Sequence, residues 1–226
     1  MANGFVAIFA NSRANAFLYE EIQRLNNTGW YTNVYRYPGA KFDYLCSEAK
    51  RYVLTNPGDI TYIMGGINDI YTRHDALPWQ TRPTYTFDWQ SQGQFMNTLC
   101  EIFETNVANL HKELEGQRVI ICPLIGAELA KTCTNATAIR QQWLDNTVWS
   151  VNNTIYHLNR YAMTSTPWIS RAVHTSHVKT GRKVRYDKLE GGLHFKNSLT
   201  TEVATTLVNH IGALKSKIEL NGYTPS

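Results

Sequence analysis

Two residues near opposite ends of the sequence, Ser12 and His194, have side chains suited to nucleophilic catalysis. A serine hydroxyl is a weak nucleophile until a base removes its proton, and an imidazole can do so near neutral pH. Ser12 follows an apolar run and is expected at the start of a helix, where backbone N–H groups favour developing negative charge. An isolated serine there, or the preceding Asn11, would equally serve as a helix cap. The pair predicts a nucleophile and its general base.

Two further positions, Gly39 and Asn68, carry groups that can donate hydrogen bonds to an oxyanion. Gly39 lies in PGA at 38–40, where the missing side chain lets a backbone N–H approach a ligand closely. Asn68 lies in GGIND at 65–69, and its side-chain amide is a donor. Each stretch taken alone is also an ordinary turn. With the N–H of Ser12, these donors would stabilise a tetrahedral intermediate.

The segments that must position these residues alternate between strand and helix patterns. Apolar, β-branched runs occur at 5–10, 31–36, 59–64 and 118–124. Helical spacing of apolar residues occurs at 13–25, 41–54, 94–114, 138–162 and 198–219. Such alternation predicts an α/β fold, in which helices cover both faces of a mostly parallel sheet, and we expect one domain over residues 1–226. Ligands meet such sheets at the carboxyl ends of the strands, where the candidate residues lie.

Taken together and in this order, the stretches resemble the SGNH (GDSL-like) hydrolases. GGIND contains an intact Gly-x-Asn-Asp block, PGA matches the second block, and Ala-Asn-Ser at 10–12 keeps the serine of the usual Gly-Asp-Ser. His194 matches the late histidine block, and the resemblance runs from residue 5 to about residue 210. It implies a flavodoxin-like three-layer α/β/α sandwich with a mostly parallel five-stranded sheet. It also implies Ser12 as nucleophile, His194 as base, and Gly39 and Asn68 in the oxyanion hole.

The first and last blocks depart from the family pattern. The position three before the histidine, usually aspartate, is Gly191, so the acid that would fix the histidine tautomer and stabilise its charged form is missing. Glu190 and Asp187 are the nearby candidates for that role, and a backbone carbonyl is a weaker alternative. Asn11 replaces the aspartate of the first block, where the resemblance implies a loop-organising role that an amide can also fill. We expect Asn11 and Asp69 beside the substrate.

An insert at 75–93 follows the Gly-x-Asn-Asp block directly and is rich in proline and aromatic residues. A loop there would overhang the active site, so Trp79, Tyr85 and Trp89 would form a wall that binds an acyl group or a sugar. Alternatively, these side chains only hold a long loop in place.

Neither the cysteines nor the histidines predict a metal or a cofactor. The four cysteines are scattered without a CxxC pair, and free buried thiols are expected. His174 and His177 lie three residues apart, but no third ligand accompanies them at metal-binding spacing. His74, His111, His157 and His210 are expected on the surface or in helices.

The net charge of +4 lies in one segment, KTGRKVRYDK at 179–188, and the rest of the chain is balanced. Such a run is usually a solvated loop, although it could contact phosphates. Because no RNA-binding motif accompanies it, a nucleic-acid partner is the least favoured function.

Composition and the chain start narrow the setting of the protein. Hydrophobic residues make up 43% of the chain, and no unbroken apolar stretch reaches the roughly 18 residues of a membrane span. The N-terminus runs into the first predicted strand without a secretory signal, so we expect an intracellular protein or a piece of a polyprotein. The late segment TPWISRAVH…YDKLEGGLHF also resembles the end of SGNH domains in some viral and retroelement polyproteins.

These observations favour a serine esterase that removes acetyl or other short acyl groups from a small-molecule or glycan-borne ester. The alternative is an inactive or weakened pseudo-enzyme that keeps the fold to bind a glycan, a lipid or a protein. Ala10, Asn11 and Gly191 motivate that alternative.

Overall fold

The computed structural model has a central parallel sheet in the order β2-β1-β3-β4. Its strands are β1 (Phe5–Ala10), β2 (Tyr31–Arg36), β3 (Ile60–Met64) and β4 (Arg118–Ile121). The structure describes residues 5–16, 19–27, 29, 31–57, 59–70, 89–114, 117–132, 137–162, 179–180, 183–184 and 186–220. Within this part of the chain four of the five expected strands are present, and each lies in a segment where the sequence predicts one.

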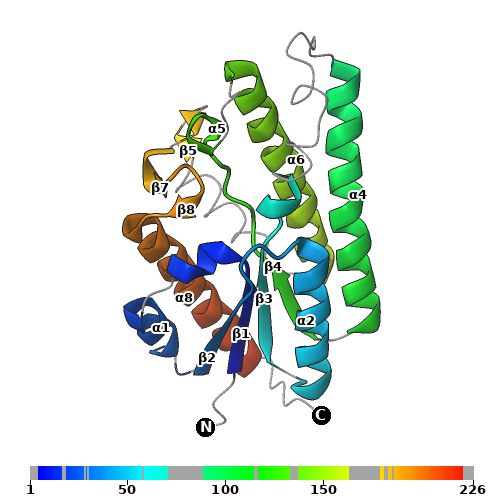
Figure 1. Ribbon diagram of the computed structural model, residues 1–226. Coiled ribbons are helices and arrows are strands. Elements are labelled where there is room, and N and C mark those ends of the chain that lie inside the picture. Colours follow the sequence, from blue (N-terminus) through cyan, green and yellow to red (C-terminus); the bar gives the residue numbers. More distant parts are fainter. Residues whose placement is uncertain are drawn as a thin grey trace.

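Helices cover both faces of the sheet, so the predicted α/β/α sandwich is confirmed (Figure 1). One face carries α1 (Tyr19–Asn26) and α8 (Asn197–Leu220), and the other carries α2 (Phe42–Thr55), α4 (Trp89–Glu113) and α6 (Ala138–Ala162). Alternate β1 residues explain this arrangement, because successive side chains in a strand point to opposite faces. Val6 and Ile8 belong to the core under α8, whereas Ala7 and Phe9 belong to the core under α2, α4 and α6.

Several helix boundaries differ from the sequence-based expectation, most of them by a single residue. The segment expected as one helix at 13–25 consists of a 3-10 helix, η1 (Ser12–Ala16), followed by α1. Helix α4 begins at Trp89, so the end of the aromatic insert is helical rather than a loop. Helix α8 begins at Asn197, one residue before the predicted start.

The strand expected at 118–124 ends at Ile121, and residues 122–127 continue as a buried, irregular segment. Buried backbone groups need hydrogen-bond partners, and side chains of α6 provide them. Asn152 accepts a bond from the N–H of Leu124 (2.6 Å) and donates to its carbonyl (2.8 Å). The Gln141 amide donates to the carbonyl of Ala127 at 2.9 Å. The segment therefore loses strand geometry without losing its hydrogen bonds.

Short elements lie beyond the carboxyl ends of the strands (Figure 1). The basic run expected as a loop contains an antiparallel pair, β5 (Lys179–Thr180) and β6 (Lys183–Val184). The others are α5 (Leu129–Thr132), η4 (Tyr186–Lys188), β7 (Leu189–Glu190) and β8 (His194–Phe195). None of the helices that the structure describes is both long enough and apolar enough to cross a membrane.

Candidate active site

Ser12 is separated from β1 by Asn11 and is the first residue of η1, where it is half-buried. The turn before it is held by Asn11, whose side-chain oxygen accepts a hydrogen bond from the N–H of Arg13 at 3.1 Å. The Asn11 N–H donates to the carbonyl of Met64 at the end of β3, at 3.3 Å. Because Asn11 is 1% exposed, the structure places it as an organiser of the turn.

Gly39 lies in the turn after β2, Asn68 lies in the helical residues 67–70 after β3, and one hydrogen bond links these two stretches. Asn68 donates from its side-chain amide to the carbonyl of Ala40 at 2.9 Å. Gly39 has φ +76°, a conformation that glycine adopts without strain. The second N–H of the Asn68 amide is not engaged by any residue that the structure describes. Both candidate oxyanion donors thus belong to one connected unit.

Asp69 follows Asn68 and fixes the start of α2. Its carboxylate accepts a hydrogen bond from the N–H of Phe42, the first residue of the helix, at 2.9 Å. Burial raises the pKa of Asp69 to about 6. The sequence predicts Asp69 beside the substrate, whereas the structure places its side chain at a helix N-terminus.

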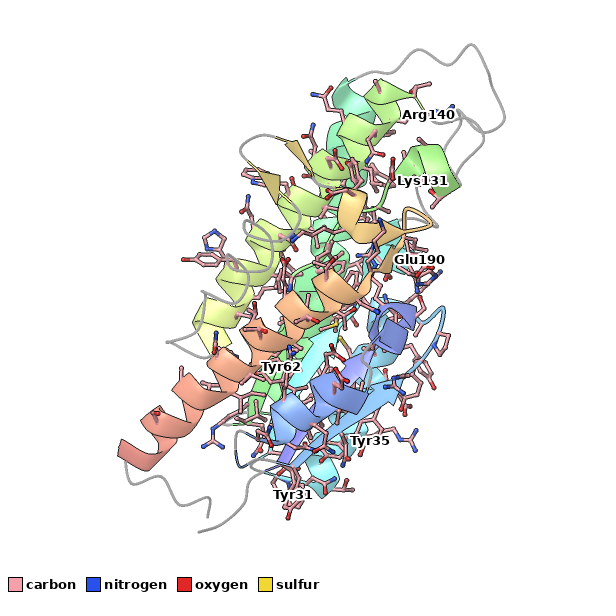
Figure 2. The ribbon with its side chains drawn as sticks, turned by 90° about the vertical axis from the view of Figure 1, so that its left-hand side faces the viewer. Tyr31, Tyr35, Tyr62, Lys131, Arg140 and Glu190 are labelled. Carbon is pink, nitrogen blue, oxygen red and sulfur yellow. The ribbon has the colours of Figure 1, made fainter. Side chains whose placement is uncertain are left out.

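His194 is the first residue of β8, which pairs with β7 so that Glu190 lies directly opposite His194. Directly opposite side chains lie on the same face of an antiparallel pair. The turn between them has φ +57° at Gly191 and +75° at Gly192, the two successive positive values that a type I′ turn requires. Glu190 and His194 are both exposed, and Glu190 lies on the outside of the molecule near Lys131 (Figure 2).

Asp187, the other candidate acid, lies in η4 and is exposed. Its backbone carbonyl accepts a hydrogen bond from the Lys196 ammonium group at 2.6 Å. Of the two candidate acids, only Glu190 is the cross-strand partner of His194.

Arg13, which the sequence analysis does not single out, connects the serine element to the histidine element. Its guanidinium group donates to the carbonyls of Ile125 and Gly126, the latter at 2.7 Å. The same group lies over the Phe195 ring, 5.2 Å from its centroid. Arg13 is 4% exposed, and burial lowers its pKa to about 9. The side chains beside Ser12 and His194 are therefore in direct contact.

Two adjoining cavities of about 20 Å³ each lie at this end of the sheet, and both are bordered by Met64, Pro123, Ile125 and Phe195. The first also reaches Asn11 and Arg13, on either side of Ser12. Each has room for about one water molecule or a methyl-sized group. Within the described part of the chain, no direct hydrogen bond joins the Ser12 hydroxyl to the His194 imidazole.

Some of the residues singled out in the sequence fall outside the part of the chain that the structure describes. Trp79 and Tyr85 lie outside the described residues, as do His174 and His177. Trp89 is the first residue of α4. Among the described residues, no three His, Cys, Asp or Glu side chains form a group that could hold a metal ion. Cys46 and Cys122 are buried and unoxidised, and burial raises the pKa of Cys122 to about 12.

The sequence matches no family model and no curated protein, whereas solved structures match over nearly the whole chain. A lipase/acylhydrolase from Enterococcus faecalis is 14% identical, with a TM-score of 0.51 over 93% of this chain and 96% of its own. A GDSL-like lipase from Bacteroides thetaiotaomicron is 11% identical, with a TM-score of 0.54 over 93% and 88%. The acetyl xylan esterase AlAXEase is 13% identical, with a TM-score of 0.54 over 92% and 99%. This chain has their fold.

The shared fold confirms the architecture that the resemblance to SGNH hydrolases implies. At identities of 11 to 14%, the likeness to these structures shows the fold and does not show the chemistry. The narrower resemblance, to domains of viral and retroelement polyproteins, stays a prediction.

Proposed function

We propose that the protein is a serine esterase of the SGNH type. The observation that carries the proposal is the connected arrangement of the candidate donors that follow β2 and β3, the two strands that flank β1, in which the Asn68 amide is bonded to Ala40 next to Gly39. In the reaction, His194 takes the proton of the Ser12 hydroxyl while the serine oxygen attacks the ester carbonyl carbon. The N–H groups of Ser12 and Gly39 and the amide of Asn68 donate to the resulting oxyanion.

The second half of the reaction returns the serine. Collapse of the tetrahedral intermediate breaks the bond to the alcohol, which leaves with the proton held by His194. A water molecule then gives its proton to His194 and attacks the acyl-serine, and the acid departs as Ser12 recovers its proton. Glu190, opposite His194 on β7, is the carboxylate that we assign to orient the imidazole and stabilise its charged form.

The substrate we propose is an acetyl or short acyl ester. The cavity that reaches Asn11 and Arg13 supports this choice, because it has room for a methyl-sized group. The fold shared with an acetyl xylan esterase is consistent with a glycan-borne ester.

Two observations favour a second candidate, a pseudo-enzyme that binds a glycan, a lipid or a protein. Glu190 is exposed, so water weakens its influence on His194. Within the described residues, Ser12 and His194 also share no hydrogen bond. Catalytic hydrogen bonds are often long in unliganded enzymes, so the esterase remains the better-supported function.

The decisive experiment combines p-nitrophenyl acetate hydrolysis with covalent labelling by a fluorophosphonate. An esterase hydrolyses the ester, gains the mass of one phosphonyl group on Ser12, and loses both properties on Ser12→Ala. The matched control is Ser216→Ala, because Ser216 is an exposed serine on α8 that donates to the carbonyl of Gly212. A folded parent protein without hydrolysis or labelling would favour the pseudo-enzyme.

A further inference from the structure

We propose that Arg13 is a positioning residue that aligns Ser12 with His194 by holding η1 and the β7–β8 hairpin on the buried segment 122–128. This inference rests on the proposed function for its catalytic meaning, whereas the alignment itself is a property of the fold.

Arg13 lies between the two elements that it is proposed to align. Arg13 follows Ser12 in η1, and its guanidinium group lies over the ring of Phe195, which follows His194 in β8. The side chain next to the nucleophile therefore contacts the side chain next to the base. A displacement of either element changes this contact.

The segment to which Arg13 donates hydrogen bonds is itself held in place, and it also holds the hairpin. Its carbonyls at Ile125 and Gly126 accept the guanidinium bonds, and Asn152 pairs with both backbone groups of Leu124. Further along, the N–H of Glu128 donates to the carbonyl of Gly192 at 2.7 Å. The serine element and the histidine turn are thus attached to the same segment. The first is attached at Ile125 and Gly126, and the second at Glu128.

Gly192 makes the second attachment possible. A Cβ atom there would lie 2.7 Å from the Glu128 carbonyl oxygen and 2.9 Å from the Lys131 Cβ atom, closer than real contacts allow. The hairpin turn can approach the segment only because this position has no side chain.

The two carbonyls and the aromatic ring around this side chain suit arginine in particular. The planar guanidinium group donates to two neighbouring carbonyls and places its face on an aromatic ring, which an ammonium group cannot do. No carboxylate pairs with Arg13 among the described residues, so a cation is buried at an energetic cost. Simple packing would be served better by an apolar residue, and the retained charge indicates a geometric role.

The first test is kinetic and uses Arg13→Lys and Arg13→Met at a temperature well below unfolding. Misalignment of Ser12 and His194 lowers kcat by about tenfold to a hundredfold. Because Arg13 also borders the first cavity, a larger change in kcat than in KM indicates misalignment, whereas a change in KM alone indicates altered binding of the acyl group. Guanidinium chloride, at concentrations far below those that unfold proteins, should restore part of kcat to Arg13→Ala and none to Ser12→Ala. The matched control is Arg36→Met, because Arg36 donates to the carbonyl of Ala14 in η1 at 3.2 Å but approaches from β2.

The second test does not need activity. In Arg13→Met, hydrogen exchange of peptides from 186–196 should accelerate, whereas peptides from α2 and α6 keep the parent rate. Wild-type kcat in the Arg13 variants, or unchanged exchange at the hairpin, would overturn the proposal. A parent protein without esterase activity, combined with faster hairpin exchange in Arg13→Met, would reject the proposed function and support the alignment. If Arg13→Met does not fold, hydrogen exchange and kcat of Arg13→Lys test the proposal in the same way.

Discussion

Asn68 has a structural task in the fold and a chemical task in the proposed reaction. One N–H of its side chain holds the carbonyl of Ala40, which fixes the orientation of the amide beside Gly39. A donor that is fixed before the substrate binds stabilises the transition state without the cost of reorganisation. The bond to Ala40 is therefore part of the catalytic proposal as well as of the loop.

Asn68→Ala should lower kcat for p-nitrophenyl acetate by about a hundredfold or more, because one oxyanion donor contributes roughly 3 kcal/mol to the barrier. Stability should fall by only about 1 kcal/mol, the usual net value of one hydrogen bond. Asn106→Ala is the matched control, since its amide also donates to a backbone carbonyl, that of Ile102 at 2.9 Å in α4. Full turnover in Asn68→Ala would remove this residue from the oxyanion hole.

The acid that supports His194 in the proposed reaction can be identified with two substitutions. Glu190→Gln should lower kcat by more than about tenfold, though by less than the ten-thousandfold found for a buried triad aspartate, because the Glu190 carboxylate is exposed to water. Asp187→Asn, the matched control, should leave kcat near the parent value. If Asp187→Asn is the damaging change, the two assignments must be exchanged.

Gly191→Asp tests whether the family's usual acid can be restored. The structure has open space at this position, with no atom within 4 Å of a built Cβ, and φ +57° lies in the left-handed region that Asp tolerates better than most residues. The new carboxylate should add little to kcat if Glu190 already supports His194. A large increase would show instead that the parent works without a good acid. Urea unfolding of both proteins separates a catalytic effect from backbone strain.

At the scale of elements, the loops after β2 and β3 are joined at the start of α2. Asp69 caps this helix through the Phe42 N–H, so the conformation of the Gly39 loop depends on a residue from the next strand. The carboxylate is buried, and its ionisation is therefore unfavourable in the folded protein.

Asp69→Asn should stabilise the protein at pH 7 and change little at pH 4. The pKa of Asp69 is about 6 in the folded state and near 3.9 when unfolded, so the folded state loses relative stability as the pH rises from 4 to 6. An asparagine oxygen accepts the same bond from Phe42 without that penalty, a gain of up to about 3 kcal/mol. Urea denaturation at both pH values measures it, and Asp69→Ala serves as the variant without a cap. Equal stability of Asp69→Asn and the parent at pH 7 would contradict the prediction.

The strands and their terminal residues could be predicted because the signals are local. Apolar runs that end in turn residues identify β1, β2 and β3, and the same ends contain Ser12, Gly39 and Asn68. Other features depend on residues far away in the sequence. The strand at 118–124 stops at Ile121 because α6 amides satisfy the backbone that follows, and no local pattern reports a partner 28 residues away.

The buried position of Arg13 could not be predicted from the sequence for the same reason. Its partners, Ile125 and Gly126, lie 112 and 113 residues further along the chain. In the sequence it is one arginine among the charged residues, and burial is unusual for that residue type. Its position next to Ser12 is the only signal that could have drawn attention to it.

At the scale of the whole molecule, one sheet separates two apolar cores, and a polar pair lies inside one of them. Tyr62 of β3 and His210 of α8 are both fully buried, and their side chains share a hydrogen bond of 2.5 Å between the hydroxyl and Nδ1. The sequence predicts His210 on the surface or in a helix, and it is helical but buried. Tyr62 is labelled in Figure 2, and its bond to His210 attaches the last helix to an interior strand of the sheet.

Tyr62→Phe should destabilise the fold by about 1 to 3 kcal/mol, because a buried polar group of His210 loses its partner. Tyr52→Phe is the matched control, since the half-buried Tyr52 hydroxyl donates to Asp59 at 2.8 Å and water can replace it. Urea denaturation at pH 7 compares the two. A larger loss in Tyr52→Phe than in Tyr62→Phe would show that the buried pair is not a main source of stability.

The anchoring of segment 122–127 by Asn152 also affects how the protein can be made. Asn152-Asn153-Thr154 is an acceptor sequence for N-linked glycosylation, and Asn152 is 5% exposed with both amide atoms bonded to Leu124. A sugar attached before folding would prevent these bonds, so expression through a eukaryotic secretory route should give misfolded, glycosylated chains. Thr154→Ala removes this acceptor and leaves those at Asn26 and Asn135, and it should raise the yield of folded protein in that host, as judged by circular dichroism. Bacterial cytoplasmic expression avoids the modification.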